Sequence, residues 1–246
     1  MEQQRLDKII ASTGAYSRRE VKELIRHGRV LVDGVPARSA QDKADPESAE
    51  ITVNGVPLVY RRFTWVMLNK PAGYLSATED GRGTTVLDLL PPELQKQGLF
   101  PVGRLDKDTE GLLLLTNEGS LAHDLLSPRR HVDKEYYVRV SGRLTEEDSR
   151  AFAAGMTLAD GLQCQPAELE ILTAGEESEA HVILREGKFH QIKRMLAQLG
   201  KPVIYLERIR MGNLRLDPSL LRGEFRLLTD CEIQALREAQ IPREKT

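Results

Sequence analysis

The chain has 246 residues, of which 40% are hydrophobic and 29% are charged, and its formal net charge is −2 at pH 7. This size suggests one or two domains, and the composition is typical of a cytosolic globular protein. The amino terminus lacks the order of a signal peptide, and no apolar run approaches the roughly 18 residues of a membrane span, so we expect a cytoplasmic protein without a membrane partner. Only two cysteines, Cys164 and Cys231, are present without histidines at ligand spacing, which predicts neither a disulfide framework nor a zinc site.

The first 60 residues or so are typical of a small module of their own. The pattern predicts a helix over residues 5–12 and a second helix that begins after Ser17, an N-cap residue with Glu20 three positions later. This second helix should end at Gly28, where the strand RVLVDG follows and closes in an Asp-Gly turn. A further hairpin is expected at the Asn-Gly pair of AEITVNGVPLVY.

The order RLDKIIASTGAYSRREVKELIRHGRVLVDG resembles the S4 RNA-binding domain, and the resemblance covers about residues 4–50. It implies that two helices and a hairpin present a basic face to ribosomal RNA. S4-like modules occur in ribosomal proteins, tRNA synthetases and RNA-modifying enzymes, so the module predicts RNA binding and leaves the reaction open. The alternative is a packing unit of two helices without a ligand. The residues expected to contact RNA are Arg5, Lys8, Arg18, Arg19, Lys22 and Arg26.

A linker is expected near residues 60–63, which divides the chain into domains at 3–60 and 61–242. Beyond the linker, short strand-like runs (WVMLNK, LLLLTN, EYYVRV, AELEIL and AHVILRE) alternate with a few helices, predicted at 119–126, 145–154 and 189–199. Because strands and helices do not repeat regularly, we expect an α+β domain with a mainly antiparallel mixed sheet.

The charges are segregated along the chain although they nearly cancel in total. Residues 1–30 hold seven Lys or Arg against four Asp or Glu, and residues 185–215 hold eight against two. Residues 139–180 hold three basic side chains against nine acidic ones. This pattern is consistent with cationic surfaces that meet phosphates, and equally with ordinary solvated helix faces.

The stretch GRLDKDTEGLLLLTNEG places Asp106 between two cations, Arg104 and Lys107, and ahead of four leucines. An exposed aspartate is ionised at neutral pH, and nearby cations would keep it charged when a substrate expels water. Gly103 and Gly111 would permit tight turns near a ligand, and the leucines suit a buried strand that anchors the loop. Taken alone, the stretch also fits a turn with a mixed-charge tip.

The string DKDT also suggests the aspartate pair of the metal-dependent phosphatases that form an aspartyl-phosphate. That pattern places one more residue before the threonine and follows an unbroken apolar strand. Neither condition holds in this sequence.

The whole stretch resembles the active-site motif of the pseudouridine synthases, GRLDxxTxGLLLLTNDG. Three further segments resemble parts of the same family: MLNKPAGYLS the start of its catalytic domain, SPRRHVDKEYYVRV the segment with its active-site tyrosine, and GKFHQIKRML its third motif. With the S4-like module they follow the order of the RsuA-type branch. The resemblance implies a pseudouridine synthase catalytic domain that isomerises uridine in RNA, without a cofactor or metal.

The resemblance assigns roles to four residues. Asp106 would be the catalytic carboxylate, either as a nucleophile or as the base that removes a sugar proton. Tyr136 would pack on the target uracil, and period-two alternation in KEYYVRV puts it on one face with Val138 and Val140. Arg104 would lie near the target nucleotide, and Lys193 would pair with the carboxylate.

Other polar residues of these motifs receive different interpretations. Lys188 and Arg194 are expected to contact phosphate, whereas His190 is interpreted as structural. Asp108 and Glu110 lie close to the carboxylate in sequence, but the resemblance gives them no part in the reaction.

The expected substrate is 16S ribosomal RNA, because SPRRHVDKEY and HQIKRM look closer to small-subunit members of the branch than to large-subunit members. The partner would be this RNA or a small-subunit assembly intermediate, and we expect a monomer. Two alternatives are a synthase acting on 23S ribosomal RNA and a noncatalytic RNA-binding or ribosome-assembly protein. The presence of Asp106, Arg104, Tyr136 and Lys193 disfavours the noncatalytic one.

Overall fold

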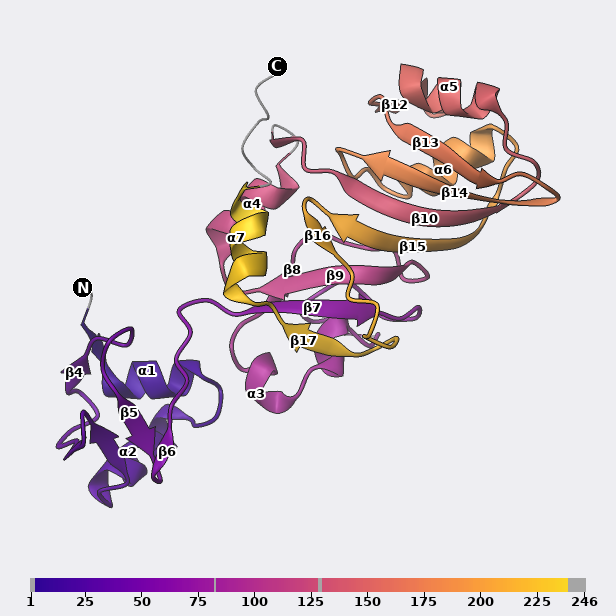
Figure 1. Cartoon of the computed structure of the whole chain (residues 1–246). Coiled ribbons are helices and arrows are strands. Elements are labelled where there is room, and N and C mark those ends of the chain that lie inside the picture. Colours follow the sequence, from indigo (N-terminus) through magenta and orange to yellow (C-terminus); the bar gives the residue numbers. More distant parts are fainter. Residues whose placement is uncertain (1–2, 82, 128–129, 239–246) are drawn as a thin grey trace. The chain divides into compact units, whose positions relative to one another are not determined.

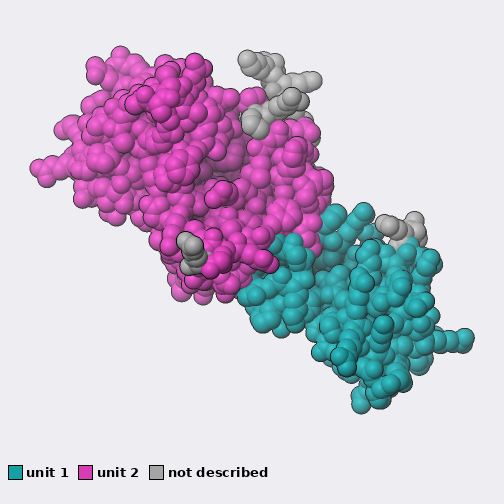
Figure 2. Space-filling view, turned by 180° about the vertical axis from the view of Figure 1, so that it is seen from behind, with its two compact units in different colours: residues 1–64, 90–99 teal, residues 65–89, 100–246 magenta. Residues whose placement is uncertain are grey.

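The computed structural model describes residues 3–81, 83–127 and 130–238, and the chain divides into two compact units (Figure 2). Unit 1 comprises residues 1–64 and 90–99, and unit 2 comprises residues 65–89 and 100–246. Residues 239–242, which the expected second domain includes, lie outside the described residues. Among the described helices none is long and apolar enough to cross a membrane.

Unit 1 contains the two helices that the sequence predicts, together with short strands. Helix α1 (Leu6–Ser12) is followed by α2 (Arg18–Arg26), and both pack on a core that includes Ile9, Val21 and Val30, each 0% exposed. The strands form a pair, β1 with β4, and a sheet in the order β3-β2-β5-β6. The unit also includes a short helix, α3 (Pro92–Gln95). The strands are β1 (Gln4–Arg5), β2 (Val30–Val32), β3 (Val35–Pro36), β4 (Lys43–Ala44), β5 (Ile51–Val53) and β6 (Val56–Pro57).

The local signals in unit 1 act as the sequence predicts. Ser17 accepts a hydrogen bond from the backbone N–H of Glu20, whose side chain accepts one from the Ser17 N–H, which forms a capping box. Asn54 and Gly55 have φ values of 53° and 77° and join β5 to β6. Positive φ at both central positions is what a tight hairpin requires.

Unit 2 is built on one large sheet in which neighbouring strands are antiparallel except for β9 and β15 (Figure 1). The main order is β13-β14-β10-β15-β9-β7-β17, with β8 added to β9 and β16 added to β15; a separate pair is formed by β11 and β12. The expected α+β class with a mainly antiparallel mixed sheet is confirmed. The strands are β7 (Trp65–Lys70), β8 (Phe100–Pro101), β9 (Glu110–Thr116), β10 (Lys134–Ser141), β11 (Met156–Thr157), β12 (Gln163–Cys164), β13 (Glu168–Thr173), β14 (Glu177–Leu184), β15 (Val203–Met211), β16 (Leu214–Arg215) and β17 (Phe225–Leu227).

The core of this sheet follows from the apolar runs of the sequence. Leu112 to Leu115 are each 0% exposed, because β9 lies between β7 and β15 in the middle of the sheet. In β10, Tyr136, Val138 and Val140 are buried on one face, which confirms the period-two alternation. The buried β9 therefore fixes the loop that comes directly before it, residues 103–109.

Two of the three helices predicted for unit 2 lie within one residue of their expected bounds, the third begins late, and the structure adds η1 (Val86–Leu89) and α7 (Asp230–Glu238), which were not predicted. Helix α6 (Gln191–Gln198) begins two residues after the predicted position, so the prediction for residues 189 and 190 is wrong. His190 has left-handed backbone angles, φ 50° and ψ 34°, and stands outside the helix as its N-cap. Left-handed angles are incompatible with a right-handed helix. The two helices close to their expected bounds are α4 (Gly119–Leu126) and α5 (Glu146–Ala154).

Candidate active site

The loop that carries Asp106 is bounded by two glycines with positive φ, Gly103 at 79° and Gly111 at 94°. A Cβ atom at Gly111 would lie 2.3 Å from the carbonyl oxygen of Arg208 in the neighbouring strand β15, so only glycine fits there. The side chain of Asp106 is 23% exposed. The loop thus holds the carboxylate at the surface while both ends of the loop are anchored in the sheet.

A buried lysine holds the backbone of this loop through hydrogen bonds. Lys70, at the end of β7, is 0% exposed, and its Nζ donates to the carbonyl oxygens of Asp106 (3.2 Å), Lys107 (3.2 Å) and Thr109 (2.8 Å). It also donates to the carbonyl oxygen of Pro71 at 3.0 Å. Burial lowers the pKa of Lys70 to about 8, although nearby carboxylates oppose this shift. The amine therefore ties together the carbonyl of Asp106 and those of two residues that follow it.

Two more residues after β7 support the same loop. The buried hydroxyl of Ser76 donates to the carbonyl oxygen of Leu105 at 2.9 Å and accepts from its N–H at 3.1 Å. The N–H of Gly73 donates to the carbonyl oxygen of Lys107 at 2.7 Å. The sequence interpretation assigned no role to Lys70 or Ser76. The sequence did contain a signal, because one polar residue ends a buried apolar strand and another follows it closely. Buried polar groups need hydrogen-bond partners, so both could have been expected to bond to a nearby loop.

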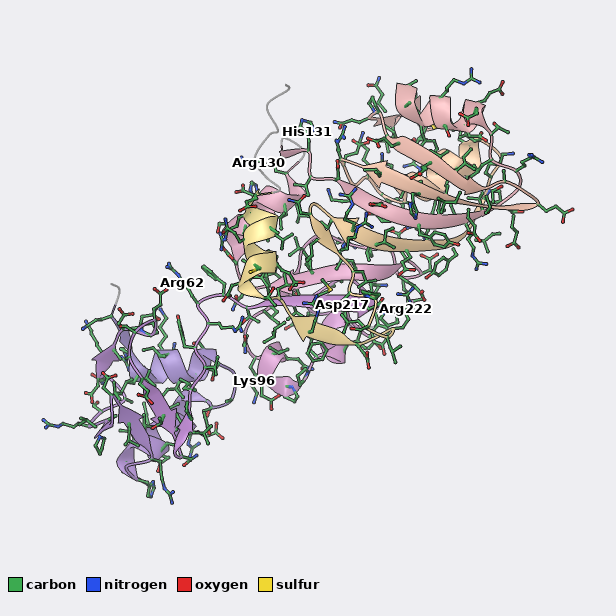
Figure 3. All side chains as sticks on the ribbon, in the orientation of Figure 1. Arg62, Lys96, Arg130, His131, Asp217 and Arg222 are labelled. Carbon is green, nitrogen blue, oxygen red and sulfur yellow. The ribbon has the colours of Figure 1, made fainter. Side chains whose placement is uncertain are left out.

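The far end of the loop is held by an ion-pair network around Glu110. Its carboxylate accepts hydrogen bonds from Arg222 Nε and from the hydroxyl of Tyr205, both at 2.9 Å. Arg222, labelled in Figure 3 in the segment that precedes β17, also contacts Glu207 at 2.9 Å. Desolvation and hydrogen bonds to the two carboxylates raise the pKa of Tyr205. Glu110 is thus occupied in fixing the start of β9.

Lys193, from the first turns of α6, provides the charge partner of Asp106. Its Nζ lies 3.0 Å from Asp106 Oδ2 and 2.5 Å from Asp108 Oδ1. Burial lowers the pKa of Lys193, but the hydrogen bonds to Asp108 and Asp106 more than offset this, so the pKa is raised overall. The hydrogen bond from Lys193 likewise lowers the pKa of Asp108. One ammonium therefore serves two carboxylates, of which Asp108 is 75% exposed.

His190 is the second side chain that reaches Asp106. Its Nε2 lies 3.5 Å from Asp106 Oδ1, and its side chain is 42% exposed. The interpretation of this residue as structural left out this contact. The left-handed backbone at His190 was the missing information, since helical spacing alone would not direct the ring to the carboxylate.

An open pocket lies beside the carboxylate. Four sequence-predicted residues line it together, Arg104, Asp106, Tyr136 and Lys188, and Gln191 contributes from the start of α6. Tyr136 is 9% exposed, whereas Arg104 is exposed. The pocket wall therefore carries a carboxylate, an aromatic ring and a long cationic side chain. These groups suit a planar polar base attached to a sugar.

The residues predicted to contact RNA are exposed or half-buried, and several of them form ion pairs. Lys188 contacts Glu186 at 3.1 Å, and Arg194 contacts Asp160 at 2.5 Å. In unit 1, Arg5 pairs with Asp7 at 2.8 Å and Arg26 with Glu23 at 2.5 Å. All six basic residues predicted to contact RNA in this unit are exposed: Arg5, Lys8, Arg18, Arg19, Lys22 and Arg26.

The sequence model of the RNA pseudouridylate synthase family matches residues 64–198, and that of the S4 domain matches residues 4–51. The chain belongs to the RNA pseudouridylate synthase family and is an enzyme of the pseudouridine synthase class.

Two relatives and one solved structure match nearly the whole chain. An uncharacterized RNA pseudouridine synthase of Bacillus subtilis (strain 168) is 47% identical over 96% of this chain and 99% of the relative. The ribosomal small subunit pseudouridine synthase A of Escherichia coli (strain K12) is 38% identical over 94% of this chain and 99% of the relative. A crystal structure of a pseudouridylate synthase, 35% identical, covers 94% of this chain and 99% of its own with a TM-score of 0.67.

Proposed function

We propose that the chain converts one specific uridine to pseudouridine in 16S ribosomal RNA, in the cytoplasm and as a monomer. The substrate would be this RNA or a small-subunit assembly intermediate. The similarity to the small-subunit enzyme of Escherichia coli, which extends over nearly all of both chains, supports this choice of substrate. The S4 domain supports a structured RNA as the binding partner.

The reaction cuts the glycosidic bond to N1 of uracil, turns the base while it stays bound, and joins C5 to the sugar. We assign Asp106 as the carboxylate that starts this sequence. It serves as nucleophile toward the nucleoside or as base toward a sugar proton, and both roles need an ionised carboxylate against the ribose. The reaction balances without a redox partner, a group donor or a metal ion.

The observation that carries this proposal is the 3.0 Å contact of Lys193 with Asp106 beside a pocket that Tyr136 also lines. A neighbouring cation keeps the carboxylate charged when RNA displaces water from the site. Tyr136 would pack against the uracil, because the pocket wall offers its ring to a flat ligand. Arg104, which is exposed at the same pocket, would contact the backbone of the extruded nucleotide.

Extrusion of the uridine is needed because its sugar and base are not accessible inside a helix, and it costs less in a loop than in a duplex. The exposed cations of unit 1 supply affinity for phosphates in this proposal: Arg5, Lys8, Arg18, Arg19, Lys22 and Arg26. Lys188 and Arg194 would add contacts near the pocket by exchanging Glu186 and Asp160 for phosphate.

Mapping pseudouridines in ribosomal RNA from cells that lack the protein tests the substrate. The proposal predicts loss of one pseudouridine from 16S ribosomal RNA, and its return when the wild-type chain is expressed again. Loss from 23S ribosomal RNA instead would contradict the substrate assignment. An unchanged map in both RNAs would contradict action on ribosomal RNA altogether.

A further inference from the structure

Two aromatic rings form a stack directly before α6. The ring centroids of Phe189 and His190 are 3.8 Å apart, and the ring planes are inclined by 18°. Phe189 is nevertheless 75% exposed. One face of the phenyl ring is therefore covered by the imidazole, while most of the residue remains in contact with solvent.

The backbone holds this stack in a closed turn. The N–H of Lys188 donates to Oε1 of Gln191 at 3.1 Å, and the N–H of Gln191 donates to the carbonyl oxygen of Lys188 at 3.2 Å. Gln191 is 4% exposed, and its side-chain amide also donates to Glu186 at 2.7 Å. The left-handed conformation of His190 lies inside this turn, and uncommon backbone angles persist where surrounding contacts fix them. Phe189 is thus presented by an ordered segment.

The turn stands next to the reaction centre. His190 Nε2 lies 3.5 Å from Asp106 Oδ1, so the stack leads from the carboxylate through the imidazole to an exposed phenyl ring. Lys188, the residue before Phe189, lines the pocket together with Asp106 and Tyr136. A single exposed apolar side chain is normal on a protein surface. Phe189 differs from such residues because the imidazole of His190 backs its ring, a closed turn holds it, and that same imidazole contacts Asp106.

We propose that Phe189, backed by His190, is a stacking platform for an unpaired nucleobase of the substrate RNA, next to the uridine that enters the pocket. This inference rests on the proposed function, since it assumes an RNA substrate whose target nucleotide lies at Asp106. Extruding one base leaves its neighbour without a stacking partner on that side. Proteins offer aromatic side chains to such unstacked bases, and this contact tolerates any base because every base has a π face.

His190 is a positioning residue in this arrangement. It supports the phenyl ring on one side and contacts the carboxylate on the other, and so couples the position of the neighbouring base to that of Asp106. Because Phe189 contacts no reacting atom, its removal should weaken binding of RNA more than it slows the chemical step. Loss of one stacked base should raise KM by roughly tenfold.

The test compares Phe189→Ala, Phe189→Leu and Phe189→Tyr with the wild type in two assays. The first is steady-state tritium release from a 16S ribosomal RNA transcript labelled at C5 of uridine. The second is fluorescence quenching of a short single-stranded RNA with 2-aminopurine on both sides of one uridine. The matched control is Leu172→Ala, which removes another exposed apolar side chain, from β13.

The alanine and leucine variants should raise KM by roughly tenfold, change kcat by much less and reduce quenching, while the tyrosine variant and the control should match the wild type. Equal quenching and equal KM in wild type and Phe189→Ala would overturn the platform, as would full recovery by leucine or absence of quenching in the wild type. A wild type that quenches but releases no tritium contradicts the proposed function while the platform stands.

Discussion

Nζ of Lys193 lies 3.0 Å from Oδ2 of Asp106, although the two residues come from separate parts of the chain, the start of α6 and the loop before β9. The same ammonium lies 2.5 Å from Asp108. This geometry supports the proposal that Lys193 is the cation that faces Asp106 once RNA displaces water. It also separates the roles of the two aspartates, because only Asp106 lines the pocket with Tyr136.

Replacement of Lys193 by methionine should reduce kcat by about 100-fold or more, a loss of roughly 3 kcal/mol of transition-state stabilisation. The physical reason is that Asp106 loses its ion-pair partner in a site from which bound RNA would displace water. Lys193→Arg keeps the charge with a different shape and should retain more activity than the methionine variant. Single-turnover tritium release from labelled ribosomal RNA measures the effect, and equal rates for both variants would contradict a role of the charge.

Asp108→Asn should lower kcat less than tenfold. The side chain of Asp108 is 75% exposed, and the residue contacts Lys193 from outside the pocket lining. In this variant Lys193 loses the carboxylate of Asp108 but keeps that of Asp106. The measurement is the same tritium assay with the wild type as control. A complete loss of turnover would show that Asp108, and not only Asp106, takes part in the chemistry.

The lowered pKa of Lys70 predicts that the free energy of unfolding rises with pH in alkaline solution. Burial lowers its pKa from 10.5 to about 8, so between these values the unfolded chain holds a proton that the folded chain has released. The free energy of unfolding should therefore increase from about pH 8 toward pH 10.5, by up to about 3 kcal/mol for this group. Below pH 8 both states carry the proton, and the contribution is constant.

Lys70→Met should flatten this rise and also lower turnover, because the carbonyls of Asp106, Lys107 and Thr109 lose their common donor. Denaturant unfolding at pH 7.5 and pH 9.5 measures the first effect. Lys134→Met is the matched control, since burial also lowers the pKa of Lys134 to about 8 but its amine bonds to Val132 instead of the Asp106 loop. Equal loss of turnover in both variants would contradict a specific role of Lys70.

The basic face of α2 should contribute phosphate contacts. Replacing Arg18, Lys22 and Arg26 together by alanine should weaken RNA binding and flatten its salt dependence by about 0.7 log units for each lost contact on single-stranded RNA. The paired change of Arg143 and Arg150 to alanine in unit 2, where both are exposed, is the control. An unchanged slope of the salt dependence in the triple variant would show that α2 is not part of the RNA-binding surface.

Much of the fold could be predicted because local signals agree with the tertiary structure. The capping box of Ser17 and Glu20, the Asn54–Gly55 turn and the four buried leucines of β9 each act through neighbours in sequence. The strand order could not be predicted from these signals. The pairing of β9 with β15 is parallel and joins residues about a hundred positions apart, which no local periodicity encodes.

The candidate site could be predicted only in part, for the same physical reason. The expected roles of Asp106, Tyr136 and Lys193 could be assigned by resemblance to the family. The support of the loop by Lys70 could not, because it depends on the positions of backbone carbonyls. The start of α6 was predicted two residues too early, because the left-handed angles of His190 are imposed by the closed turn around Gln191.

The most direct measurement of the central claim is tritium release from ribosomal RNA labelled at C5 of uridine, with wild type and Asp106→Asn at equal RNA saturation. The substitution keeps the size of the side chain and removes its negative charge. The account predicts that the variant binds the RNA with most of the wild-type affinity and releases no tritium above background. Release at the wild-type rate would contradict the assignment of Asp106 as the catalytic carboxylate.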